Sequence, residues 1–216
     1  MKRFLTMLAL TFGLGLIATS PARAESLAEG IDYVTLAAPQ ATSAPDKIEV
    51  VELFWYGCPH CHQFEPMLHN WSEALPDDVV FVRMPAVLSP RWELLARAYY
   101  AAELLGVLDK THEALFAAIH VKKQKFETED ALAGFFKAQG VDEQEFRDAM
   151  KSFGVASKLN RARQMTQRYG INGVPTLIIN GKYRTSASEA GSHAAMLKVT
   201  DQLIEQERAA SQTAAR

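Results

Sequence analysis

Residues 54–64 read FWYGCPHCHQF and hold both cysteines of the 216-residue chain, Cys58 and Cys61. An apolar run over residues 48–55 leads into this stretch and is typical of a buried β-strand. Apolar residues at helical spacing lead out of it, at Phe64, Met67, Leu68, Trp71 and Leu75. The pattern therefore predicts that the two cysteines lie where a strand gives way to a helix.

This junction favours a reactive Cys58. If Cys58 is the N-cap, Pro59 takes the first helical position, where a missing N–H costs nothing. The Cys58 sulfur then faces the free N–H groups of His60 and Cys61 and the positive end of the helix dipole. His60 adds a polar and potentially cationic neighbour. We therefore expect a lowered pKa for Cys58, a shielded and less reactive Cys61, and a pair within disulfide reach.

One acidic residue lies inside the predicted strand. Strand alternation places Glu52 on the same face as Val50 and Phe54. Burial would raise the pKa of Glu52 and let it exchange protons with Cys61. Glu49, by contrast, is expected to reach solvent at the edge of the strand.

The first 24 residues predict a cleaved secretory signal peptide. They combine a charged start, an apolar run over residues 4–17 that is short for a membrane span, and Ala22-Arg23-Ala24 as cleavage site. An oxidising compartment permits disulfides, but two cysteines are too few to staple a chain of this length. A bridge over two intervening residues would also constrain the unfolded chain little. A purely structural disulfide is therefore not expected.

The chain becomes helical after residue 88. Helices are predicted over residues 91–105, 109–121, 128–140, 142–154 and 155–169. Asp109, Thr128 and Asp142 are the predicted helix caps, and glycines close the helices, Gly154 among them. The phenylalanines of this block are expected in its core: Phe135, Phe136, Phe146 and Phe153. The histidines at positions 112 and 120 receive no role.

Strand character returns near the C-terminus. Residues 176–179 and 183–185 predict a hairpin around Asn180-Gly181, and a final helix covers about residues 192–208. Together with an edge strand at 33–36 and a strand at 79–84, the order is βαβ, a block of helices, then ββα. We expect an α/β fold with an inserted all-helical domain. The predicted limits are 25–87 and 163–210 for the α/β domain, 88–162 for the insertion and 211–216 for a frayed tail.

This organisation resembles the thioredoxin fold, in which Cys-x-x-Cys opens the helix of the βαβ unit. Pro66, five residues after Cys61, and Val174-Pro175 before the third strand also match that pattern. The dipeptide Pro59-His60 and the helical insertion narrow the resemblance to the DsbA family of periplasmic thiol oxidases. The resemblance extends over nearly all of the predicted mature chain.

The resemblance implies a role for each site residue. Cys58 would be the nucleophile that forms a mixed disulfide with substrate, Cys61 the resolving thiol, and His60 a residue that stabilises the reduced protein. Glu52 would be the buried acid. A cis-proline loop that binds an extended substrate peptide would comprise Val174, Pro175 and Thr176. His62 receives no role, and His62 and His69 are expected on the helix surface.

The resemblance also implies partners. The protein would donate its disulfide to newly secreted reduced proteins and be reoxidised by a membrane protein of the DsbB type. Family members combine a strongly depressed cysteine pKa with an oxidising potential. No cofactor or metal is expected. A formal net charge of −2 without a basic stripe argues against nucleic acid, and a monomer in the periplasm is expected.

Three alternatives remain open. An isomerase or reductase of the same fold would usually need a reductant supply or a dimerisation module, and no separate module is visible in the sequence. A zinc module would need a second ligand pair at zinc-finger spacing, which is absent from the sequence. A redox-inactive peptide-binding chaperone would retain its function after Cys58→Ser.

Overall fold

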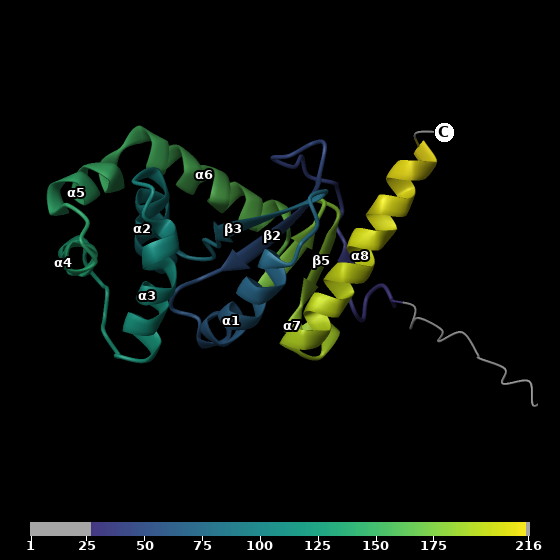
Figure 1. The fold of residues 1–216 in the computed structure, drawn as a ribbon, viewed down its shortest axis with the longest axis horizontal. Helices are drawn as coiled ribbons and strands as arrows, with labels where there is room; N and C mark the ends of the chain where they lie inside the picture. The colour runs from purple at the N-terminus through teal and green to yellow at the C-terminus, as the bar shows by residue number, and fades with distance from the viewer. Residues whose placement is uncertain (1–26, 215–216) are drawn as a thin grey trace, which may run out of the picture.

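The structure, a computed structural model, describes residues 27–214. The predicted signal peptide lies outside the described residues. One five-stranded sheet has the order β1-β5-β4-β2-β3 (Figure 1). Its strands are β1 (Val34–Thr35), β2 (Ile48–Phe54), β3 (Val79–Pro85), β4 (Thr176–Ile179) and β5 (Tyr183–Ser186).

Strand β2 lies in the interior of the sheet, between β4 and β3. All seven of its residues are buried, as its apolar sequence predicts, and it pairs parallel with β3 and antiparallel with β4. Helix α1 (Pro59–Glu73) connects β2 to β3. The β4–β5 hairpin turns at Asn180 and Gly181, which both have positive φ, and Lys182 N donates to Ile179 O at 2.9 Å. The predicted βαβ and hairpin units are thus confirmed.

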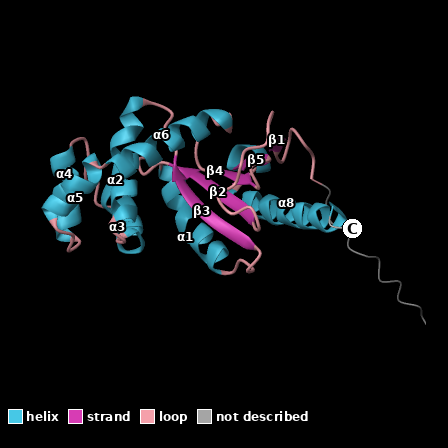
Figure 2. Cartoon of the chain, turned by 90° about the horizontal axis from the view of Figure 1, so that it is seen from above, coloured by secondary structure: helices cyan, strands magenta, loops and turns pink. Residues whose placement is uncertain are grey.

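A helical insertion separates β3 from β4 and forms one end of the molecule (Figures 1 and 2). It contains the 3₁₀-helix η1 (Pro90–Trp92) and helices α2 (Glu93–Leu104), α3 (Leu108–His120), α4 (Glu129–Ala138), α5 (Glu143–Lys151) and α6 (Phe153–Arg168). After β5 follow α7 (Ala187–Ala190) and α8 (His193–Ala214). Among residues 27–214, no helix is both long and apolar enough to cross a membrane.

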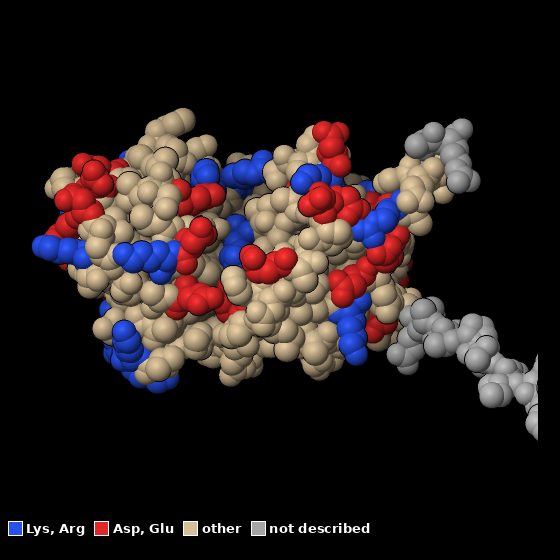
Figure 3. Space-filling model, in the orientation of Figure 1, with Lys and Arg blue, Asp and Glu red and all other residues tan. Residues whose placement is uncertain are grey.

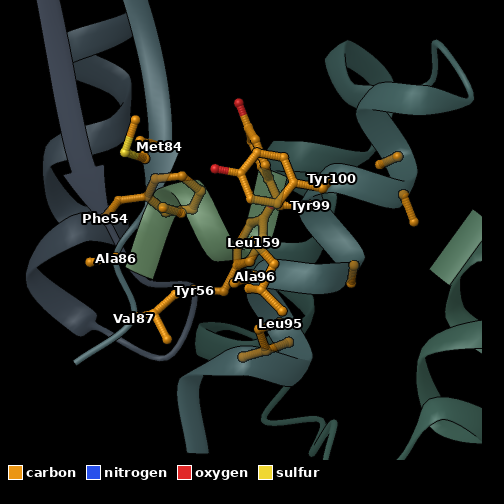
Figure 4. Close-up of a cluster of buried hydrophobic side chains, with 14 of the residues drawn as sticks. Phe54, Tyr56, Met84, Ala86, Val87, Leu95, Ala96, Tyr99, Tyr100 and Leu159 are labelled. Atoms are coloured by element: carbon orange, nitrogen blue, oxygen red, sulfur yellow. The ribbon is translucent and has the colours of Figure 1, made fainter. Parts of the chain in front are cut away.

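Two apolar clusters cover the faces of the sheet. Val50 on one face packs with Phe64 and Leu68 of α1 and with Leu203 of α8. The other face belongs to a larger cluster that continues into the insertion. Figure 4 shows part of this cluster, in which the centroid of the Phe54 ring lies 5.2 Å from that of Tyr56 and 5.4 Å from that of Tyr99 on α2. The insertion is therefore packed directly against the chain segment that leads to the cysteines.

Two of the three predicted helix caps in the insertion are confirmed. Thr128 caps α4 by accepting from Ala131 N at 3.2 Å, and the Asp142 carboxylate caps α5. The prediction that Asp109 caps a helix was wrong. It lies in the first turn of α3, whose N-cap is Val107, and its charge there still favours the helix dipole.

Two further predictions in the insertion were wrong for one reason. The Ser152 hydroxyl accepts from Val155 N at 3.2 Å and starts α6 at Phe153. Gly154 therefore lies inside α6 instead of ending α5. Phe153, in the first turn of α6, is 88% exposed instead of buried, whereas Phe136 and Phe146 form part of the core. At the C-terminal end, α8 continues to Ala214, beyond the predicted end at 208.

Glu49 was also predicted wrongly. It is buried, with 4% exposure, because the loop before β2 folds back over it. Its carboxylate accepts from Ser43 N at 2.8 Å and from the Ser43 hydroxyl. These two hydrogen bonds compensate for the water that the carboxylate loses.

Candidate active site

Cys58 is the N-cap of α1, as predicted. Its backbone is extended (φ −88°, ψ 116°), Pro59 is the first helical residue, and Cys61 N donates to Cys58 Sγ at 3.3 Å. The preceding turn closes through Cys58 N, which donates to Trp55 O at 2.9 Å. Both cysteines are free thiols, with exposures of 8% for Cys58 and 0% for Cys61. Only Cys58 reaches the surface.

The environment of Cys58 favours its thiolate. Its pKa is lowered to about 6, chiefly because the Cys61 thiol donates a hydrogen bond to it. Burial opposes this effect, while the backbone N–H groups of Cys61 and His60 and the charge of His60 reinforce it. The helix-terminus argument from the sequence is therefore confirmed, with the Cys61 thiol as an additional cause.

Cys61 has the opposite character. Burial, followed by the neighbouring Cys58 sulfur and the charge of Glu52, raises its pKa above the ordinary value. At neutral pH the pair therefore holds one thiolate on Cys58 and one proton on Cys61. Of the two sulfurs, Cys58 therefore has the greater thiolate character.

The loop before β4 lies against the cysteine pair, although 116 residues separate Val174 from Cys58. Cys58 Sγ lies 3.3 Å from Val174 O, to which it can donate only in its protonated form, and the Val174–Pro175 peptide bond is cis, as expected. Thr176 Oγ1 donates to Gly173 O at 2.9 Å. A groove of about 590 Å³ adjoins the loop and is also lined by His60 and by parts of β5, α7 and α8.

Glu52 lies buried in β2, with 0% exposure, as predicted. Neither carboxylate oxygen has a hydrogen-bond partner among residues 27–214, and Arg83 Nε is 3.5 Å from Oε2. Burial, and then the charge of Glu65, raises the pKa of Glu52 well above its ordinary value, against the effect of Arg83. Burial therefore shifts this carboxyl group toward its neutral, protonated form.

Sequence reasoning did not foresee the polar chain that continues from Glu52. Arg83 Nη2 donates to Glu65 Oε1 at 2.5 Å, and His112 Nε2 lies 3.4 Å from Glu65 Oε2. Burial alone would raise the pKa of Glu65, but hydrogen bonds and charges from His112 and Arg83 hold it below the ordinary value. Tyr56 continues the chain, with its hydroxyl 2.8 Å from His112 Nδ1. The sequence signal for these contacts was a single acidic residue, Glu65, within the apolar pattern of α1.

His62 is not a plain surface residue. Its ring stacks on His120 of α3, with centroids 5.0 Å apart and planes at 10°. His69 is exposed, as expected. Among residues 27–214, no group of three or more His, Cys, Asp or Glu side chains is arranged to hold a metal ion. On the face in Figure 3, basic and acidic side chains are interspersed instead of forming a patch of one sign.

The sequence matches a family described as the DSBA-like thioredoxin domain over residues 83–198. The thiol:disulfide interchange protein DsbA of Pseudomonas aeruginosa is 43% identical over 190 residues, which are 88% of this chain and 90% of that protein. DsbA of Azotobacter vinelandii is 43% identical over 92% of both chains.

Solved structures agree with the sequence relatives. The crystal structure of P. aeruginosa DsbA is 44% identical, with a TM-score of 0.82, and the match covers 85% of this chain and 95% of that one. The oxidoreductase DsbA from Xylella fastidiosa is 35% identical, with a TM-score of 0.80, over 85% and 98% of the two chains. With the Cys58–Cys61 pair at the start of α1, the chain belongs to the DsbA family of thiol:disulfide interchange proteins and is a thiol:disulfide oxidoreductase of the thioredoxin fold.

Proposed function

We propose that the protein works in the periplasm, donating its Cys58–Cys61 disulfide to reduced, newly secreted proteins. The observation that carries the proposal is the asymmetry of the pair. A surface sulfur with a pKa of about 6 leaves readily as thiolate, and a buried thiol with a raised pKa holds its proton. Stabilisation of the Cys58 thiolate favours the reduced enzyme and hence makes its disulfide more oxidising.

The exchange has two steps. A substrate thiolate attacks Cys58 Sγ, the Cys58–Cys61 bond breaks, and the Cys61 sulfur leaves and takes a proton. A second substrate thiolate then attacks the substrate sulfur of the mixed disulfide, and Cys58 leaves as thiolate. The substrate loses two electrons and forms a disulfide, while the enzyme gains them and becomes a dithiol.

The remaining site residues support these steps. Glu52 supplies the proton that Cys61 takes, since it is buried, its pKa is raised toward the protonated form, and it acts electrostatically on that sulfur. Pro59 and His60 shape the helix N-terminus that holds the Cys58 thiolate. The backbone of the cis-proline loop binds an extended substrate chain through Val174, Pro175 and Thr176.

Reoxidation requires an electron acceptor outside this chain. A membrane protein of the DsbB type, acting as a reoxidase on a monomer, fits the family of the chain and the expected secretory signal. Reoxidation reverses the chemistry: a disulfide of the reoxidase accepts the Cys58 thiolate, and two electrons leave the enzyme. Cell fractionation and N-terminal sequencing of the mature protein test the periplasmic location.

The deciding experiment is a redox titration of the pair. The protein is equilibrated with glutathione buffers, and its reduced fraction is read by thiol alkylation. We expect a potential more oxidising than about −180 mV. A value near −270 mV, typical of thioredoxin, would contradict the donor direction and favour a reductase.

A trapping experiment tests the nucleophile separately. Cys61→Ser should accumulate mixed disulfides with substrate proteins on Cys58, whereas the matched Cys58→Ser variant should accumulate none. Trapping by both variants alike would contradict the assignment of Cys58 as the attacking sulfur.

A further inference from the structure

Tyr56 occupies the turn that carries Cys58. The turn runs from Trp55 to Cys58 and closes through the bond from Cys58 N to Trp55 O. Tyr56 is its first middle residue, and its side chain is almost fully buried at 2% exposure. Because only three residues separate β2 from the Cys58 cap, the position of Tyr56 in the middle of them influences where Cys58 lies at the helix N-terminus.

Helix α3 of the insertion binds Tyr56 at both ends. His112 Nδ1 lies 2.8 Å from the Tyr56 hydroxyl, and His120 Nε2 lies 2.7 Å from the Tyr56 carbonyl oxygen. Between them, the ring of Phe116 packs on the Tyr56 ring with centroids 4.8 Å apart. The three α3 residues are spaced by four, so they form one stripe along the helix, and Tyr56 lies lengthwise on it. We call these three residues the α3 stripe.

The α3 stripe also reaches the other side of the cysteine pair. His120 stacks on His62, which directly follows Cys61. His112 approaches Glu65 of the same helix α1, with Nε2 and Oε2 3.4 Å apart. One helix of the insertion therefore contacts the residues before Cys58 and those after Cys61.

The protons in this contact are ordered. Burial lowers the pKa of His112 and raises that of Tyr56, so the imidazole is neutral and the hydroxyl keeps its proton. The Tyr56 hydroxyl then donates to His112 Nδ1, which leaves the N–H of Nε2 facing Glu65. For its part, His120 donates to the Tyr56 carbonyl, which can only accept. In each of these two hydrogen bonds, the donor and the acceptor are therefore assigned.

We propose that His112 and His120 are positioning residues for thiol–disulfide exchange, which hold Tyr56 so that Cys58 Sγ meets the N–H groups at the start of α1. The proposal rests on the function proposed above for Cys58. According to this proposal, the insertion affects the reactivity of Cys58. The hydrogen bonds that favour the Cys58 thiolate depend on the geometry of the helix cap, and α3 of the insertion maintains that geometry.

The test compares variants of α3 that keep or remove the donor to Tyr56. His120→Leu removes it, and His120→Gln keeps an N–H donor on a side chain of similar reach. Thr111→Val is the matched control, since this buried α3 residue bonds Val107 O at 2.8 Å and has no hydrogen bond to Tyr56. The readouts are the pH profile of Cys58 alkylation in the reduced protein, the equilibrium constant with glutathione, and unfolding in urea.

We expect His120→Leu to move the alkylation profile toward higher pH and to make the disulfide about fivefold harder to reduce, the factor that corresponds to one hydrogen bond of ordinary net strength. His120→Gln should restore most of the change, and Thr111→Val should lower stability only. If His120→Leu lowers stability but leaves both redox readouts at the wild-type values, the α3 stripe is mere packing and the proposal is wrong.

His112 is tested through its partner. Tyr56→Phe removes the hydroxyl and keeps the ring, so the protein should fold even if His112→Leu does not. Tyr56→Phe should move the Cys58 profile in the same direction as His120→Leu, and an unchanged profile would overturn the role of His112. Each variant is compared with the wild type. The redox potential of the wild type tests the proposed function independently of these comparisons.

Discussion

At the scale of single residues, most features of the site were predictable from the cysteine motif. The spacing of Cys58, Pro59 and Cys61 on a strand-to-helix junction predicted the cap, the lowered pKa and the shielded partner, because these depend on local backbone geometry. The burial of Glu52 followed from its place in the middle of a strand that is apolar on both faces. Arg83 and His112 had no such local signal. Their roles arise from contacts between distant segments, which a pattern in one segment does not contain.

Glu52 offers the clearest test at this scale. Glu52→Gln keeps a neutral, nearly isosteric side chain but has no proton to give to Cys61. We expect the glutathione equilibrium of the pair to stay near the wild-type value and the rate of substrate thiol oxidation to fall by about a hundredfold, the lower end for general acid–base catalysis. Stopped-flow tryptophan fluorescence measures the rate. Glu49→Gln, a buried carboxylate bonded to Ser43 instead, is the control, and equal rates for both variants would exclude proton transfer by Glu52.

At the scale of elements, boundaries were predictable where a side chain caps the backbone. Thr128 and Asp142 start α4 and α5 as their sequence signals indicate. The boundary between α5 and α6 was misplaced because two signals competed. Gly154 suggested a helix end, but the Ser152 hydroxyl two residues earlier captures Val155 N and starts the next helix first. Phe153 was consequently assigned to the core, although it sits on the exposed side of that start.

The cap of α5 allows stability to be separated from function. The Asp142 carboxylate accepts from Gln144 N and Glu145 N, both at 2.9 Å. Asp142→Ala leaves these donors without their partner and should reduce the free energy of unfolding by about 1 kcal/mol. Asp142→Asn, which keeps an acceptor, should restore most of it. Urea unfolding checks both values, and the redox equilibrium should not change, because α5 packs mainly against the helices α2, α4 and α6 of the insertion. A shifted equilibrium would contradict that separation.

At the scale of the whole molecule, the order of elements predicted the thioredoxin fold with an inserted helical domain, and the structure and relatives confirm it. The order of elements did not predict that the sheet and the helical insertion share one apolar cluster. Such a cluster depends on which face of the sheet packs against which helices. We propose 25–87 with 163–210 and 88–162 as the limits of the two parts. Helix α6 crosses the second limit without a break and so ties the insertion to the sheet.

The Cys58 thiolate should make the stability of the reduced protein depend on pH. Its pKa is about 6 in the folded protein and about 8.5 in an unfolded chain, so the folded state holds fewer protons between these values. The resulting stabilisation is fully present above pH 8.5, is about 1.4 kcal/mol at pH 7, and is lost as pH falls through 6. The oxidised protein has no thiol to titrate. The difference in unfolding free energy between the reduced and oxidised forms should therefore grow from pH 5.5 to 8.

Urea unfolding of both forms under anaerobic conditions measures this difference, and groups that titrate alike in both forms cancel from it. Cys61 stays protonated in this range, because its raised pKa moves its own titration to higher pH. The reduced Cys58→Ser variant should show no such growth. A flat difference in the wild type would mean that Cys58 is not ionised in the folded protein. The size of a positive result is informative as well: 1.4 kcal/mol corresponds to about 30 mV. Any oxidising strength beyond that amount must come from interactions other than the ionisation of Cys58, either contacts that favour the reduced form or contacts that disfavour the oxidised form.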